Sequence, residues 1–327
     1  METTSATARQ LPRYQELRII FMGTPAFAVA SLEALLQAGC RIVAVITAPD
    51  KPAGRGMKLQ ESDVKKYAVE KGLRLLQPEK LKNPAFLEEV KSIQADLQVV
   101  VAFRMLPEIL WSMPPMGTIN LHGSLLPQYR GAAPIQWAII NGEKETGVTT
   151  FRLQKEIDTG NILLQKSFPI GAEDTAGDVH DRMKLIGAKL LVETVIGLAD
   201  GSLQATPQDA WLAATGRAGQ PLHHAPKIST ETCRINWNKP VAEIHNLIRG
   251  LSPFPAAFTL FEGKTMKIFK SHQEQHTPEV PPGQYQTDKK TFIRFTAADG
   301  YVYVDELQLE GRKKLLTEDF LRGYRFA

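Results

Sequence analysis

Two polar side chains that can take part in catalysis stand two residues apart in an otherwise apolar segment. Residues 118–122 read Thr-Ile-Asn-Leu-His, and alternate side chains of a β-strand share one face, so Asn120 and His122 point the same way. Further along, Asp158 begins the sequence Asp-Thr-Gly. A carboxamide, an imidazole and a carboxylate together suit the transfer of one small acyl group. These three residues are therefore the candidate catalytic set.

Loop-forming residues follow the polar pair. Gly123 allows a sharp exit from the strand, and Pro127 stiffens the next turn. Gly131 and Pro134 then precede the apolar run at 135–140, which predicts a helix. This order predicts a cavity rim at the strand end. The alternative is a polar strand end whose side chains only bind loop backbone.

Several motifs along the chain match one known family in order and spacing. They are Phe-Met-Gly-Thr-Pro at 21–25, Pro-Ala-Gly-Arg-Gly at 52–56, Asn-Leu-His-Gly-Ser-Leu-Leu-Pro at 120–127, Arg-Gly-Ala-Ala-Pro at 130–134, Thr-Gly-Val-Thr at 146–149, Asp-Thr-Gly at 158–160, Ala-Pro-Lys-Ile at 225–228 and Ile-His-Asn-Leu-Ile-Arg-Gly-Leu at 244–251. From about Leu17 to the C-terminus, the chain resembles the folate-dependent formyltransferases, and within them the branch that formylates initiator methionyl-tRNA.

The resemblance implies a reaction and a role for each polar residue. A formyl group would pass from 10-formyltetrahydrofolate, the donor co-substrate, to the α-amino group of initiator methionyl-tRNA, giving N-formylmethionyl-tRNA for translation initiation. Asn120 would donate a hydrogen bond to the formyl oxygen, and His122 would stabilise the oxyanion or relay a proton. Asp158 would orient His122, favour its charged form and help to remove the amine proton through water. No metal is implied.

The resemblance also implies a folate pocket built from two loops. Its expected contacts are Ser124, Leu125, Leu126, Pro127, Phe103 and Met105. The earlier loop departs from the family pattern, because Arg104 stands where relatives usually carry glycine. Leu106 of the same loop reads as a core residue.

Residues 50–58 contain two glycines, one proline and three cations, which excludes a helix interior or a central strand. Such loops are often only solvated, but the resemblance implies that this one enters the tRNA acceptor end. The expected tRNA contacts are Lys51, Arg55, Lys58, Lys227 and Arg249. The formal net charge of +4 is too small to indicate nucleic acid by itself, so this function requires a local basic surface.

The hydrophobic pattern predicts an α/β fold in two domains. Short apolar strands alternate with helical stretches through the first part, which predicts a parallel sheet covered by helices. The later part reads mainly as short strands with turn signals. The sequence pattern adds a loose tail at 1–16 and a linker at 204–226. The resemblance implies that 17–203 is a Rossmann-like formyltransferase domain and that 227–327 is an OB-like β-barrel that holds the tRNA.

Other protein classes fit less well. Gly23 stands alone where a dinucleotide-binding loop needs a series of glycines, and an aspartic protease needs a second Asp-Thr-Gly. Cys40 and Cys233 form no disulfide framework, which suits a cytoplasmic protein. No signal peptide or membrane-spanning run is present.

Two alternative functions stay open at this point. The first is an enzyme that formylates an amino sugar nucleotide with the same three polar groups. The second is an RNA-binding relative that has lost catalysis, against which the intact catalytic set argues. We expect a monomer, and weak self-association also stays open.

Overall fold

The computed structural model describes residues 13–53 and 58–326. The chain divides into two compact units. The first comprises Met1–Pro127, Gly147–Lys166 and Met183–Pro221, and the second comprises Gln128–Thr146, Ser167–Arg182 and Leu222–Ala327. Among the described residues, no helix combines the length and apolar character needed to cross a membrane.

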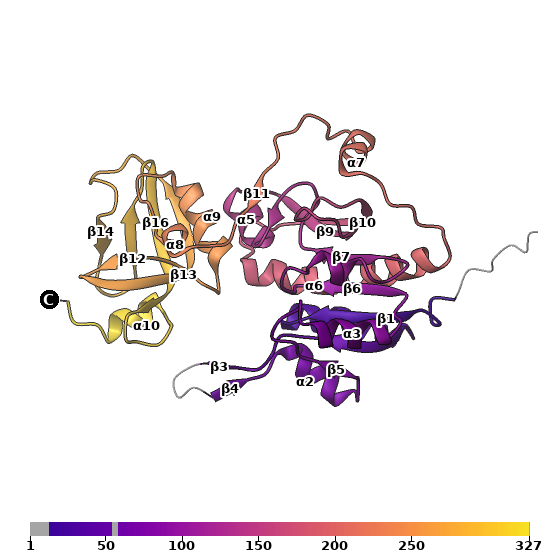
Figure 1. Ribbon diagram of the computed structural model, residues 1–327. Helices are drawn as coiled ribbons and strands as arrows, with labels where there is room; N and C mark the ends of the chain where they lie inside the picture. Colours follow the sequence, from indigo (N-terminus) through magenta and orange to yellow (C-terminus); the bar gives the residue numbers. More distant parts are fainter. Residues whose placement is uncertain (1–12, 54–57, 327) are drawn as a thin grey trace, which may run out of the picture. The chain divides into compact units, whose positions relative to one another are not determined.

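A seven-stranded sheet in the order β5-β2-β1-β6-β7-β9-β10 forms the centre of the N-terminal part (Figure 1). Its strands are β1 (Arg18–Gly23), β2 (Arg41–Ile46), β5 (Leu75–Leu76), β6 (Leu97–Val101), β7 (Thr118–His122), β9 (Glu145–Arg152) and β10 (Ile162–Pro169). The first five are mutually parallel, whereas β9 runs antiparallel to β7. The first strand is central and the chain winds to each edge in turn, which confirms the predicted Rossmann-like α/β fold.

Helices alternate with strands along this part of the chain. They are α1 (Ala26–Gln37), α2 (Asp63–Glu70), α3 (Pro84–Ser92), α4 (Glu108–Trp111), α5 (Pro134–Ile140), α6 (Ala176–Ala199) and α7 (Gln208–Ala214). Local sequence sets several of their starts: the side chains of Ser62 and Asn83 cap α2 and α3 by accepting backbone N–H bonds. Buried Phe86 and Val90 of α3 pack with Ile20 and Met22 of β1 in one apolar cluster.

The C-terminal part is a curled antiparallel sheet of the OB-like type, a half-barrel. Its strands are β12 (Ala257–Phe261), β13 (Lys264–Gln275), β14 (Tyr285–Thr287), β15 (Ile293–Thr296), β16 (Gly300–Leu309) and β17 (Leu315–Leu316), and its helices are α8 (Thr230–Cys233), α9 (Val241–Leu251) and α10 (Thr317–Arg322). The ring of Trp237 stacks on Phe295 at 4.6 Å in its core, while the indole N–H donates to Thr259.

Two small sheets complete the structure. β3 (Lys51–Ala53) pairs with β4 (Lys58–Gln60), and β8 (Arg130–Gly131) pairs with β11 (His224–Ala225). The segment expected to be a linker, 204–226, contains α7 and β11. Most of the tail predicted at 1–16 lies outside the described residues.

Candidate functional site

The loops predicted to form the site leave the same edge of the sheet. Gly23 pairs with Val101, and Val101 pairs with Leu121, so β1, β6 and β7 end side by side. A Cβ at Gly23 would stand 2.6 Å from the Cβ of Ala28, so this glycine serves close packing of the first turn. Carboxyl ends of parallel strands are where ligands bind in such sheets.

Asn120 and His122 share one face of β7, as predicted. Leu121, between them, faces Gly187 of α6, where an added Cβ would meet its side chain at 2.9 Å. In the sheet, Asn120 lies beside Val100 of β6 and Phe151 of β9, with strands paired on both sides. The side chain of Asn120 is half-buried and that of His122 is buried. A central strand therefore fixes both groups.

Asp158 comes within ion-pair distance of His122, although 36 positions separate them in the sequence. Nδ1 of His122 lies 3.7 Å from Oδ2 of Asp158, and both side chains are largely shielded from solvent. At this distance the carboxylate acts on the imidazole as a negative charge and an orienting group. The structure thus brings the three predicted catalytic residues onto one region of the first unit.

The Asp-Thr-Gly turn is held by close backbone contacts. Asp158 has a positive φ of 55°, a conformation that few non-glycine residues adopt. A Cβ at Gly160 would stand 1.7 Å from the carbonyl oxygen of Arg152. Only glycine fits this approach, which brings the turn against β9. In the described part of the chain, no cluster of three or more His, Cys, Asp or Glu is arranged to hold a metal ion.

The predicted folate loop after β7 is tied to β9 through Thr149. The hydroxyl of Thr149 donates to the carbonyl oxygen of Ser124 at 2.6 Å and accepts from the backbone N–H of Leu126 at 3.1 Å. Leu126 is 1% exposed and packs with Phe151, Ile162 and Trp211. Its side chain therefore belongs to the core, so Leu126 offers a ligand at most its backbone. Ser124 and Pro127 are also buried, whereas Leu125 is half-buried.

The second predicted folate loop follows β6. Met105 is 74% exposed and Phe103 is half-buried against the core, while Leu106 is buried as expected. The guanidinium of Arg104 donates to the carbonyl oxygens of Pro78 and Glu79, and burial lowers its pKa. Arg104 thus links this loop to the segment after β5, a role that glycine cannot supply.

The predicted tRNA contacts differ in their surroundings. Lys51 and Lys227 are exposed. Arg55 lies outside the described residues, as does the side chain of Lys58. The role of these four residues in binding tRNA stays a prediction.

Arg249 requires a correction. Its side chain is 4% exposed, and its guanidinium donates to the carbonyl oxygens of Gly171 and Asp174 and to the side chain of Asn246. Burial lowers its pKa, although Asp174 and Glu173 oppose this effect. A guanidinium used in this way is not presented to a nucleic acid, so Arg249 holds α9 to the segment before α6 instead. Charged residues of an amphipathic helix usually face solvent, so nothing in the sequence indicated that Arg249 faces inward.

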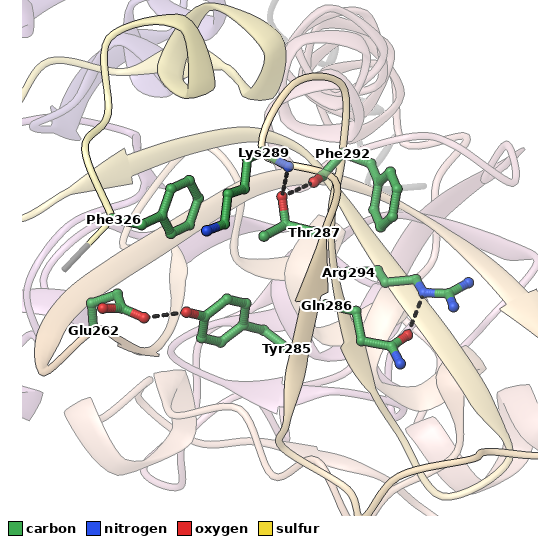
Figure 2. Close-up of a pocket in the computed structure, with 8 residues that line it drawn as sticks. All are labelled: Glu262, Tyr285, Gln286, Thr287, Lys289, Phe292, Arg294 and Phe326. Carbon is green, nitrogen blue, oxygen red and sulfur yellow. Dashed lines mark hydrogen bonds between the residues drawn. The ribbon is translucent and has the colours of Figure 1, made fainter.

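A hollow of about 530 Å³ lies in the C-terminal half-barrel (Figure 2). It is lined by Glu262, Tyr285, Gln286, Thr287, Lys289, Phe292, Arg294 and Phe326. The lining groups are mostly satisfied among themselves: Tyr285 donates to Glu262, and Nε of Arg294 donates to Gln286. The hollow contains none of the predicted catalytic groups. The candidate catalytic site is therefore the one formed by the polar residues of β7 and the turn at 158–160.

Four residues that support the site were not predicted as functional. Thr149 lies in a recognised motif, but its hydroxyl contacts depend on the folded loop. Gln165, Gln208 and Trp211 follow no sequence motif, and each makes contacts at the site through a side-chain amide or indole N–H. Because these two glutamines and this tryptophan lie outside any motif, the sequence contains no signal that could have identified them.

Comparisons with known proteins identify the family of the chain. Residues 17–195 match the formyl transferase family, and residues 227–325 match the formyl transferase C-terminal domain. The chain is 51% identical over 318 residues to methionyl-tRNA formyltransferase of Bacteroides thetaiotaomicron, covering 96% of this chain and 97% of the relative.

Solved structures share the fold at low sequence identity. The N-formyltransferase from Helicobacter canadensis, crystallised with folinic acid and dTDP-3-aminofucose, has a TM-score of 0.65 at 21% identity, covering 91% of this chain and 100% of that one. HypX from Aquifex aeolicus, crystallised with tetrahydrofolic acid, has a TM-score of 0.62 at 18% identity over 94% of this chain, which spans 47% of HypX. With the near-complete match to its relatives, the chain belongs to the formyl transferase family and, within it, to the methionyl-tRNA formyltransferases.

Proposed function

We propose that this protein transfers the formyl group of 10-formyltetrahydrofolate to the α-amino group of initiator methionyl-tRNA. The observation that carries the proposal is the association of Asn120, His122 and Asp158 in a chain 51% identical to a methionyl-tRNA formyltransferase over nearly its whole length. The product, N-formylmethionyl-tRNA, would serve translation initiation. The enzyme would act in the cytoplasm, as a monomer.

The reaction forms one carbon–nitrogen bond and breaks another. The neutral α-amine of the methionyl group attacks the formyl carbon, and the carbonyl electron pair moves onto oxygen. Collapse of this tetrahedral intermediate expels N10 of the folate. The amine loses one proton and N10 gains one, so the reaction is balanced without an oxidant, a reductant or a metal.

Each polar residue has a task in this sequence. The amide N–H of Asn120 is proposed to donate to the formyl oxygen as it becomes negative, which preorganised donors do at little cost in reorganisation. His122 stabilises the same oxygen or passes a proton to N10. Asp158, 3.7 Å from the imidazole, orients His122 and helps a water molecule to take the amine proton.

The two substrates would meet at the carboxyl ends of β1, β6 and β7. The folate would bind between the loop at 102–107 and the loop at 123–127, which leave neighbouring strands. Met105, Phe103 and Leu125 offer accessible side chains there. Ser124, Leu126 and Pro127 shape the loop mainly through their backbone.

The tRNA would be held by basic side chains, with Lys51, Arg55, Lys58 and Lys227 as the proposed contacts. The paired strands β3 and β4 present Lys51 to solvent, and Arg55 falls between them in the sequence. Phosphate contacts of this kind position an RNA end and weaken as salt concentration rises. Arg249 is left out of this set because its guanidinium is used internally.

The test is a comparison of acceptors with one donor. Purified protein is mixed with 10-formyltetrahydrofolate and with initiator methionyl-tRNA, uncharged initiator tRNA or an amino sugar nucleotide, and the products are identified by mass. Formylation of the charged tRNA alone supports the proposal. Formylation of the sugar amine instead would move the chain to the sugar enzymes. No transfer to any acceptor, together with no folate binding, would favour an RNA-binding relative that has lost catalysis.

A further inference from the structure

Helix α7 lies in the segment predicted to be a linker, yet one side chain of it is almost completely buried. Gln208 is 5% exposed, and its amide nitrogen donates to the carbonyl oxygens of Asp158 and Gly160 at 2.8 and 2.9 Å. The two hydrogens of one NH₂ group therefore contact the residues on either side of Thr159. Since Asp158 has a positive φ, these bonds hold a backbone conformation that would otherwise be disfavoured.

The next turn of α7 reaches the other loop of the site through a second glutamine. Nε1 of Trp211 donates to Oε1 of Gln165 at 2.8 Å. The amide nitrogen of Gln165 in turn donates to the carbonyl oxygen of Leu126 at 2.7 Å and to the hydroxyl of Thr149 at 2.9 Å. Because Trp211 orients Gln165 with its donors toward the loop, the indole determines how the loop is held.

Thr149 completes this network with consistent donor and acceptor roles. Its single hydroxyl hydrogen goes to the carbonyl oxygen of Ser124, and its lone pairs accept from Gln165 and from the backbone N–H of Leu126. Leu126 also packs against Trp211. The loop at 124–127 is thus attached to α7 by both a polar chain and an apolar contact.

The start of α7 is fixed as well. Thr206 and Ile162 form an isolated antiparallel bridge with two backbone hydrogen bonds of 2.8 Å. Ile162 begins β10, and Gln165 lies in the same strand. This bridge sets the register of α7 against β10, so that Gln208 and Trp211 meet their partners.

We propose that α7 is a positioning element for the formyl transfer. This inference rests on the function proposed above. Gln208 sets the backbone of Asp158 and thereby the approach of its carboxylate to His122. Trp211, acting through Gln165 and Thr149, sets the loop at 124–127 that receives the folate. Neither residue touches the reacting atoms. Because Gln208 acts on Asp158 and Trp211 acts on the folate loop, the effect on catalysis and the effect on folate binding can be measured separately.

Two variants separate these effects. Gln208→Glu replaces the side-chain NH₂ group with a carboxylate oxygen, which would face the carbonyl oxygens of Asp158 and Gly160. Trp211→Phe keeps an aromatic ring in the cluster but removes the indole donor. Gln220→Glu is the matched control, since Gln220 is exposed and its substitution adds the same charge.

The assay measures kcat, KM for 10-formyltetrahydrofolate and the pH profile of kcat with methionyl-tRNA. For Gln208→Glu we expect kcat to fall about 10- to 100-fold, because misplacement by about 1 Å has effects of that order, and the pH profile to shift as Asp158 moves from His122. For Trp211→Phe we expect KM for the folate to rise about fivefold, the effect of one ordinary hydrogen bond, with a smaller change in kcat. Gln220→Glu should match the wild type.

The outcomes distinguish positioning from general destabilisation. If α7 were only structural, both variants would lose activity in proportion to the folded fraction, with unchanged KM and pH profile, and the inference would be refuted. It would also be refuted by wild-type kinetics in folded Gln208→Glu.

A second measurement covers the case in which the wild type formylates no tRNA. Hydrogen exchange of the amides at 158–160 and calorimetric affinity for tetrahydrofolate then replace the kinetics. Faster exchange confined to that turn in Gln208→Glu, with weaker folate binding in Trp211→Phe, supports the positioning role even if the acceptor differs. Unchanged exchange and affinity in both variants would refute it.

Discussion

The substitution Gly160→Ala tests how tightly the Asp-Thr-Gly turn is built. The added Cβ would stand 1.7 Å from the carbonyl oxygen of Arg152 and 3.0 Å from the ring of Phe151. Real Cβ contacts are essentially never closer than 3.0 Å, so the turn must move by about 1.3 Å or more. The obstacle is backbone of a paired strand, which cannot rotate away as a flexible side chain would.

This displacement has a consequence for stability and another for rate. The two hydrogen bonds from Gln208 to Asp158 and Gly160 would be lost or stretched, at about 0.5–1.5 kcal/mol each, and thus roughly 1–3 kcal/mol together. For a unit of this size, each kcal/mol lowers Tm by roughly 2–4 °C. Moving the carboxylate of Asp158 from its 3.7 Å approach to His122 by an ångström or more would lower kcat about 100-fold.

Thermal unfolding and steady-state formylation measure the two effects separately. Gly323→Ala is the control, because a Cβ there meets nothing within 4 Å and its φ of −112° suits any residue. The control should keep the wild-type Tm and kcat. If Gly160→Ala matched Gly323→Ala in both measurements, the close approach at Gly160 would have no role in holding Asp158.

Four further outcomes follow from the structure. Asn120→Ala should stay folded by circular dichroism and lose turnover about 100- to 1000-fold; near-normal turnover would remove Asn120 from the mechanism. Arg249→Met should lower Tm, because two partly buried carbonyl oxygens lose a donor, and should leave KM for methionyl-tRNA unchanged; the reverse pattern would restore a tRNA contact. Burial lowers the pKa of His245, so as pH drops below about 6.5 the unfolded chain binds a proton at this histidine before the folded chain does, and the free energy of unfolding should fall. Thermal melts of His245→Gln should depend less on pH. Burial raises the pKa of Cys40 to about 11, so iodoacetamide at about pH 8 should alkylate this thiol only after unfolding, as peptide mass spectrometry would detect.

Elements with strong local signals were predicted from the sequence. The strand at 118–122 has the predicted bounds, because the alternation of polar and apolar residues dominates this stretch. The apolar run at 135–140 likewise lies in a helix, α5, as predicted. The polar pair of Asn120 and His122 followed from strand geometry alone.

Features that depend on distant partners were not predictable in this way. Residues 208–214 form a helix whose side chains bind a turn and a strand about 50 positions earlier, and no local period signals such contacts. The inward orientation of Arg249 depends on the carbonyl oxygens of Gly171 and Asp174, more than 70 positions away. Both misses arose because tertiary packing decides what a weak local pattern leaves open.

The catalytic set is supported unequally. Asn120 and His122 lie on β7, which is hydrogen-bonded on both sides, so little short of unfolding moves them. Asp158 lies in a turn with a disfavoured φ, held by Gly160 and by the amide of Gln208. Since the turn has fewer constraints than the strand, substitutions outside the site that change the rate should act mainly through the distance between Asp158 and His122. Variants that loosen this turn should therefore resemble Asp158→Asn in their pH profile, whereas variants that loosen β7 should lose the folded state.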